Sequence, residues 1–232
     1  KSNMKKRSKR YKTLVDTKIK NEKLDLKTIV EAIKKNSNSK FDESVDVSLR
    51  INLKQSKGGD YNMRTVLKLP HGTGKKIKLA VLCEQEKVSD AKKFGADIAG
   101  SDDLIQNISA GKLNFDKLIC TSSMMGKIGK FGKILGPKGL MPNPKLGTVT
   151  NDIKKSITDF KSGLVELKND KDGNLASTIG RKSFSTDNLI NNFKHFIDFI
   201  KKEKPDTIKG EFIKNIFLTS TMGISYKIKG KI

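Results

Sequence analysis

The 232-residue chain contains little cysteine, little histidine and few acidic residues for its length. Its two cysteines, Cys83 and Cys120, each lie inside an apolar run and lack the paired spacing of a disulfide framework or a zinc site. They are therefore predicted to be small core residues in a reducing compartment. His71 and His195 are too few to build a histidine metal cluster. We expect neither a metal site nor a cofactor.

Long hydrophobic runs are also missing. No stretch approaches the roughly 18 consecutive apolar residues that a membrane-spanning helix needs. Residues 1–12 carry seven basic residues and no acid, and they lack the apolar core of a secretory signal. Three interpretations of this basic arm stay open: a solvated tail, an extension that contacts RNA, or the remnant of a targeting segment. No membrane partner is expected.

Basic residues, in contrast, are abundant. The chain has 48 lysines and arginines against 25 acidic residues, which gives a formal net charge of +23 and a pI near 9.9. Such a field attracts polyanions such as nucleic acid. Hydrophobic residues make up 35% of the chain, enough for packed cores, so a disordered basic tail is excluded. The length is compatible with one or two domains.

Hydrophobic periodicity predicts an α+β texture at both chain ends and an α/β texture between them. Apolar residues alternate with polar ones in residues 44–53, which is typical of a half-buried strand. Predicted helices span residues 26–35, 89–94, 102–110, 123–131 and 151–160, and another begins after the cap residue Ser185. Predicted strands span residues 44–53, 63–69, 77–83, 96–99, 118–121, 211–219 and 224–228, with a loop at 55–60 and a hairpin of 165–168 and 175–179 around Asp172-Gly173.

This order predicts a discontinuous domain, residues 1–70 and 163–232, and an inserted α/β domain, residues 71–162. Residues 71–160 hold 15 basic and nine acidic side chains, which leaves 33 basic and 16 acidic side chains elsewhere. The net charges are therefore +6 and +17, and the discontinuous domain is the better candidate for a polyanion site.

The strings that resemble catalytic motifs are incomplete. Residues 71–75 read HGTGK, but a phosphate-binding P-loop would need glycine at position 69 and serine or threonine at position 76, where Leu69 and Lys76 stand. Gly126, Gly129 and Gly132 recur every third residue and do not form the dinucleotide-binding pattern. No Ser–His–Asp or Cys–His set can be assembled. The sequence therefore predicts no enzyme and no small-molecule substrate.

Two predicted strands present polar faces that suit RNA. Residues 44–50 place hydroxyls, a carboxylate and Arg50 on one face, directly after Lys40 and Phe41. Small hydroxyl side chains let an RNA backbone approach closely, and an exposed Phe41 would contact a base or a sugar.

The second polar face lies near the C-terminus. It carries Asn215, Phe217, Thr219 and Thr221 in alternation and ends at Met222-Gly223. The alternative interpretation is that Phe41 and Phe217 are core residues and that the threonines only favour a β-strand.

Several longer strings match a known family in order and spacing. They are GPKGLMPNPK at residues 136–145, LGTVT at 146–150, LPHGTGK at 69–75, KFDESV at 40–45, FGADIAGSDDLI at 94–105 and STMG at 220–223. Through them the chain resembles the L-one family of large-subunit ribosomal proteins, in bacterial or organellar form. The resemblance runs from about residue 10 to residue 228.

The resemblance implies a fold and a function. In fold, it implies an α+β sandwich formed by both chain ends, with an inserted three-layer Rossmann-like domain that is joined through a two-stranded hinge. In function, it implies a structural protein that binds rRNA at the mobile stalk beside the exit site and assists release of deacylated tRNA. It further implies a monomer within the ribosome and, in bacteria, a repressor that binds its own messenger RNA.

The resemblance also implies contact residues. On the discontinuous domain they are Lys40, Phe41, Ser44, Asp46, Glu166, Lys168, Asn215, Thr221, Met222 and Gly223, to which the polar strand pattern adds Thr219. The loop at residues 136–147 implies a second RNA or tRNA surface at Lys138 and Lys145. The many lysines, asparagines and isoleucines indicate an A+T-rich genome, so the ribosome is expected in the bacterial cytoplasm or in an organellar matrix.

Overall fold

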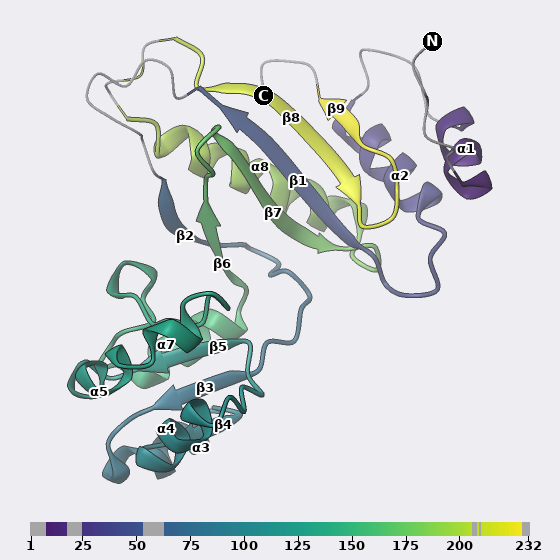
Figure 1. The fold of residues 1–232 in the computed structure, drawn as a ribbon. Coiled ribbons are helices and arrows are strands. Elements are labelled where there is room, and N and C mark those ends of the chain that lie inside the picture. Colours follow the sequence, from purple (N-terminus) through teal and green to yellow (C-terminus); the bar gives the residue numbers. More distant parts are fainter. Residues whose placement is uncertain (1–7, 18–24, 53–62, 206–207, 209, 229–232) are drawn as a thin grey trace, which may run out of the picture. The chain divides into compact units, whose positions relative to one another are not determined.

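A computed structural model describes residues 8–17, 25–52, 63–205, 208 and 210–228, which form helices and several sheets. The chain divides into two compact units, named unit 1 and unit 2 below (Figure 1). Unit 1 comprises Lys1–Met63, Leu69–Gly74 and Leu167–Ile232, and unit 2 comprises Arg64–Lys68 and Lys75–Glu166. The predicted mixture of helices and sheets is confirmed. The predicted domain limits at 70/71 and 162/163 stay a prediction.

Unit 1 contains a four-stranded antiparallel sheet in the order β7-β1-β8-β9. The strands are β1 (Ser44–Ile51), β7 (Asn174–Arg181), β8 (Ile213–Ser220) and β9 (Tyr226–Ile228). Val45, Val47 and Leu49 of β1 are buried, and the residues between them are not, as the alternation predicted. The polar residues of β1 therefore point to the opposite face of the sheet.

Helices α2 (Leu26–Asn36) and α8 (Thr186–Lys202) pack on each other and on the apolar face of this sheet (Figure 1). Helix α8 begins at the predicted cap, where the Ser185 hydroxyl accepts a hydrogen bond from the Asn188 N–H at 3.1 Å. Phe193 and Phe196 are fully buried, and each contributes about 1.5–3 kcal/mol through burial. This packing fixes which face of the sheet stays open to a partner.

Unit 2 is built on a parallel sheet in the order β4-β3-β5, formed by β3 (Leu79–Leu82), β4 (Ile98–Gly100) and β5 (Lys117–Cys120). Apolar clusters lie on both faces, because successive residues of β3 point to opposite sides. One cluster includes α3 (Val88–Lys93) and α7 (Ile153–Lys161); the other includes α4 (Asp102–Ser109), α5 (Met125–Gly129) and α6 (Gly132–Leu135). Short 3-10 turns η1 (Gln85–Lys87), η2 (Ser122–Met124) and η3 (Pro144–Leu146) complete the unit.

The predicted hairpin of residues 165–168 and 175–179 is wrong. Strand β6 (Leu164–Lys168) pairs with β2 (Arg64–Lys68) in a separate two-stranded sheet, while β7 pairs with β1. The turn itself is present, because Gly173 has a φ of 80° and a single antiparallel bridge joins Asn169 to Leu175. The local turn signal was correct, but each flanking strand finds its partner far away in the sequence.

Two further differences concern helices. The predicted helix at 123–131 is divided into η2 and α5, and a further short helix, α6, follows it, since glycines at 126, 129 and 132 weaken a continuous helix. A helix that was not predicted, α1 (Lys9–Asp16), forms within the basic arm. The rest of that arm, residues 1–7, and the predicted loop at 55–60 lie outside the described residues.

Candidate nucleic-acid interface

The start of β1 and the end of β8 meet at one end of the unit 1 sheet. Val45 pairs with Ser220, and just beyond this pair the Thr221 N–H donates to the Ser44 carbonyl at 3.1 Å. The Ser44 N–H in turn donates to the Thr221 hydroxyl oxygen at 3.0 Å. Two predicted contact residues, 177 positions apart in the chain, are thus held in direct contact.

Glu43 holds the same junction from inside. It is fully buried, and its two carboxylate oxygens accept the backbone N–H groups of Ser39 and Met222, both at 3.1 Å. Burial raises the pKa of this carboxyl group, but hydrogen bonds from Ser39, Met222 and Ser220 outweigh it and leave the pKa below its ordinary value. The ionised Glu43 therefore ties the segment before β1 to the turn after β8.

Sequence reasoning missed Glu43. Its one signal was its place in the string KFDESV, between the predicted contacts Phe41 and Ser44. A lone acid beside a strand is usually solvated, and nothing local showed that two distant N–H groups would converge on it.

Asp42 anchors the neighbouring backbone. Its carboxylate accepts hydrogen bonds from the Ser183 N–H at 3.1 Å and the Ser183 hydroxyl at 2.8 Å. Its carbonyl accepts a bond from the Arg181 guanidinium at 2.9 Å. Asp42 and Glu43 together hold the backbone that follows Phe41 in place.

Phe41 and Met222 are exposed, with relative exposures of 54% and 48%. Lys40 is exposed beside them. The interpretation of Phe41 as a core residue is wrong. Phe217 is intermediate: it is half-buried on the open sheet face, where the Lys227 ammonium lies 6.0 Å from its ring centre. Two large apolar side chains are thus held in solvent on a fixed backbone.

The open face of the sheet continues this surface. Asp46 of β1 lies opposite Thr219 of β8 and accepts a hydrogen bond from the Thr178 hydroxyl at 2.6 Å. Further along, Arg50 lies opposite Asn215. These residues form the alternating polar face that the sequence predicted.

Gly223 closes the turn. Its N–H donates to the Ser220 carbonyl at 3.1 Å, and a Cβ at this position would collide with the Ser220 hydroxyl oxygen. That hydroxyl is one of the hydrogen-bond donors to Glu43. Only glycine lets the turn close so tightly.

We therefore expect Gly223→Ala to displace the 221–223 turn and to weaken RNA binding about tenfold, measured by filter binding or titration calorimetry. Gly126→Ala is the matched control, because a Cβ there meets no atom within 4 Å. If the Gly223 variant bound like the Gly126 variant, the turn would have no part in recognition.

Comparison with known proteins identifies the family. A model of the ribosomal protein L1p/L10e family matches residues 33–224. The chain belongs to this family. It is 55% identical over 224 residues to the large ribosomal subunit protein uL1 of Pelagibacter ubique, covering 96% of this chain and 97% of that protein. It is 44% identical over 225 residues to the uL1 protein of Prochlorococcus marinus, covering 97% and 95%. The resemblance seen in the sequence is confirmed.

In this L1p/L10e-family chain, the predicted contact residue Glu166 lies on strand β6. It belongs to unit 2, where its carboxylate contacts the Arg64 guanidinium at 2.9 Å and the Lys117 ammonium at 3.2 Å. Burial raises its pKa, but hydrogen bonds and charge from Lys117 and Arg64 dominate and lower it. Lys168, two residues later, is exposed in unit 1.

Lys138 and Lys145 are both exposed on unit 2, in the predicted glycine- and proline-rich loop. The Asn143 side chain shapes this loop by accepting the Lys145 N–H at 2.9 Å. Gly139 and Gly147 both have a φ of 67°, which other residues rarely adopt. The two lysines are thus displayed on a defined loop of unit 2.

The P-loop-like string of this family member has a structural use. The Asn192 side chain is buried; it accepts the His71 N–H at 3.1 Å and donates to the carbonyls of Gly72 and Ile179 at 3.0 and 2.7 Å. Part of the string is therefore fastened to α8 instead of forming an open ring of N–H donors.

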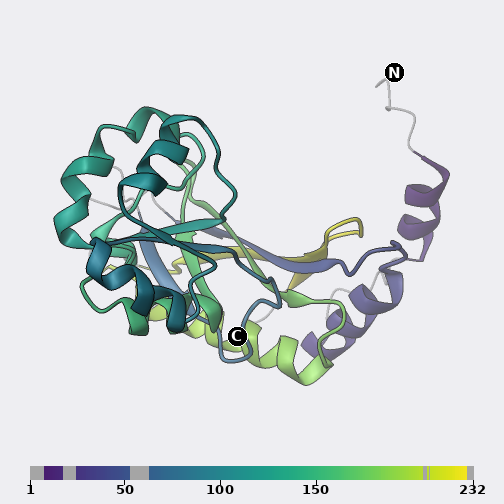
Figure 2. The ribbon, with the colours of Figure 1, turned by 90° about the horizontal axis from the view of Figure 1, so that it is seen from below.

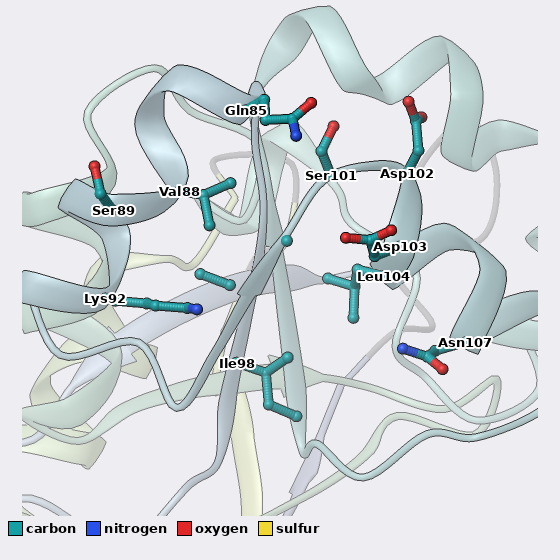
Figure 3. A pocket seen from close by; sticks show the side chains of 12 residues that line it. Gln85, Val88, Ser89, Lys92, Ile98, Ser101, Asp102, Asp103, Leu104 and Asn107 are labelled. Carbon is teal, nitrogen blue, oxygen red and sulfur yellow. The ribbon is translucent and has the colours of Figure 1, made fainter.

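A separate hollow of about 530 Å³ lies in unit 2, along β4 and between α3 and α4 (Figure 3). Asp102 and Asp103 line it, and Lys92 is the one cationic residue among its lining side chains. The Asp102 carboxylate is paired with Lys127 at 2.8 Å. With two carboxylates against one ammonium group, the lining of this hollow is unfavourable for a polyanion.

Other kinds of site are not seen in the part of the chain that the structure describes. Within it, no group of three or more histidine, cysteine or acidic side chains could hold a metal ion. Cys83 and Cys120 are buried, and burial raises the pKa of the Cys120 thiol to about 11, so this thiol is not a nucleophile at neutral pH. None of the described helices is long and apolar enough to cross a membrane.

Proposed function

We propose that this chain is a structural, non-catalytic component of the large ribosomal subunit and that unit 1 binds rRNA at the stalk junction beside the exit site. The single observation that carries the proposal is the exposure of Phe41 and Met222 on a backbone fixed by buried Glu43. Single exposed apolar side chains are common, but these two lie at the two ends of one hydrogen-bonded arrangement around Glu43, which supports a shared contact with a partner. Membership of a ribosomal protein family supports rRNA as that partner.

Affinity and selectivity have different origins in this proposal. The residues outside 71–160 carry a net charge of +17, which attracts the phosphate backbone. Selectivity comes from close contacts of Ser44, Thr221 and Gly223 with ribose hydroxyls and phosphates, and from apolar contact of Phe41 and Met222 with bases. Lys40, Asp46, Lys168, Asn215 and Thr219 extend the contact surface.

Unit 2 is proposed to serve a second partner. The exposed Lys138 and Lys145 suit the phosphates of a tRNA that leaves the exit site. Repression of the chain's own messenger would use the same unit 1 surface, since a similar RNA junction would fit it. We propose that the ribosome that contains the chain lies in the bacterial cytoplasm or in an organellar matrix.

A chemical footprint on large-subunit rRNA tests the proposal. We expect protection at one stalk junction, and co-sedimentation of the chain with ribosomes at moderate salt. A chain found only free, with protection confined to its messenger, would overturn the structural role and favour regulation. Saturable binding of a labelled nucleotide would instead support an enzyme, and we expect none, because the HGTGK string lacks the P-loop positions.

A further inference from the structure

Helix α1 is joined to the interface by a specific contact. The Arg10 guanidinium donates a hydrogen bond to the Met222 carbonyl at 2.9 Å, across 212 positions of sequence. The helix is capped by Ser8, whose hydroxyl accepts the Tyr11 N–H, and its Leu14 is buried. Figures 1 and 2 both show α1 near α2 at one end of unit 1. The folded part of the basic arm thus touches the turn that displays Met222.

The charges of α1 face solvent. Lys9, Arg10 and Lys12 are exposed, and none of them forms an ion pair within the described residues. Lys9 and Lys12 stand three residues apart, so they share a helix face, and Leu14 points away from that face. The first turn of α1 contains no acid. Asp16, one turn after Lys12, lies on the same face, so this face carries two lysines and one acid and is net positive.

We propose that α1 is a second wall of the RNA interface, in which Arg10 orients the Met222 turn and Lys9 and Lys12 bind phosphates of the RNA strand that flanks the junction. This inference rests on the proposed function. RNA phosphate is the fitting ligand because the face is cationic and exposed, and because it belongs to the helix whose Arg10 contacts the Met222 turn. Arg10 acts on recognition through Met222, so it is a positioning residue.

The two roles predict different responses. The double variant Lys9→Gln/Lys12→Gln should weaken binding by about three- to tenfold, both to the stalk-junction RNA and to an unrelated RNA duplex of equal length. The salt dependence of log affinity should flatten by about 1.5, since two phosphate contacts each contribute roughly 0.7–0.9. The matched control is Lys194→Gln/Lys202→Gln on α8, which removes the same charge from exposed positions on the helix side of the sheet.

Arg10→Gln should lower the affinity for the stalk-junction RNA about fivefold and the affinity for the unrelated duplex much less. In a Met222→Ala background the same change should have clearly less effect on junction RNA, because the oriented side chain is already gone. Circular dichroism and urea unfolding establish that each variant stays folded.

The result that overturns the inference is a Lys9/Lys12 variant that equals the α8 control in affinity and salt slope, together with Arg10 and Met222 effects that simply add. Failure of the proposed function would give different results. The unaltered chain would then bind the stalk-junction RNA no more tightly than the duplex, or the Phe41→Ala and Met222→Ala variants would bind the stalk-junction RNA as tightly as the unaltered chain. If those two variants lose affinity and the α1 variants do not, only the inference about α1 is wrong.

Discussion

Glu43→Gln should lower the free energy of unfolding by about 2 kcal/mol and weaken binding of stalk-junction RNA by about 30-fold. The carboxylate accepts the N–H groups of Ser39 and Met222 while buried. Glutamine keeps the size but turns one acceptor into an NH₂ donor that faces an N–H donor. A buried hydrogen-bonding group without a partner costs about 1–3 kcal/mol of folding free energy. The loss of affinity is a separate effect, because a displaced Met222 turn no longer fits the RNA; a loss of about 30-fold corresponds to about 2 kcal/mol.

Urea unfolding and titration of junction RNA measure the two effects. Glu31→Gln on α2 is the matched control, because Glu31 is exposed and the substitution makes the same chemical change. Both variants should keep the affinity for an unrelated RNA duplex near that of the unaltered chain. A Glu43 variant as stable and as selective as the Glu31 variant would show that the buried carboxylate does not organise the interface.

The pH dependence of this effect follows from the lowered pKa of Glu43, whose ordinary value is 4.5. A carboxyl group with a lower pKa in the folded state releases its proton more readily there, so ionisation favours folding. Its contribution to stability is present above pH 4.5 and is lost as the pH falls through the folded-state pKa. The stability difference between the unaltered chain and Glu43→Gln should therefore be constant from about pH 6 to 7 and shrink below about pH 4.

Phe41→Ala and Met222→Ala should each weaken the binding free energy for the stalk-junction RNA by about 1–3 kcal/mol, a loss of the size found when stacking side chains are removed. Neither should change the free energy of unfolding by more than about 0.5 kcal/mol, since both side chains are exposed. A loss of binding without a loss of stability is the signature of a contact residue.

Phe94→Ala in unit 2 is the control for these variants, because Phe94 is a large apolar side chain with a similar relative exposure of 42%. It should leave the affinity for junction RNA unchanged. If Phe41→Ala, Met222→Ala and Phe94→Ala all bound equally well, the exposed pair would have no role in recognition and the proposed contact surface would be wrong.

Much of the fold could be predicted because its signals are local. The alternation in β1 and the apolar face of α8 depend only on residues near each other in the chain, and both are present where the pattern placed them. The prediction that β6 and β7 pair as a hairpin was wrong because strand pairing depends on distant residues. A turn signal states that the chain reverses, not that the flanking strands pair, and here β2 and β1 are the partners.

The features of the candidate interface also fall into those that the sequence predicts and those that depend on the fold. The sequence by itself determined the positive charge, the family, and the polar and apolar side chains at Lys40, Phe41 and residues 221–223. Only the tertiary structure decided which carboxylate is buried and which arginine reaches the turn, because Glu43 and Arg10 meet Met222 across 179 and 212 positions. It also assigned Glu166 to ion pairs with Arg64 and Lys117. Residue type and spacing specify which chemistry is available, whereas burial and hydrogen-bond partners depend on chain segments that only folding brings together.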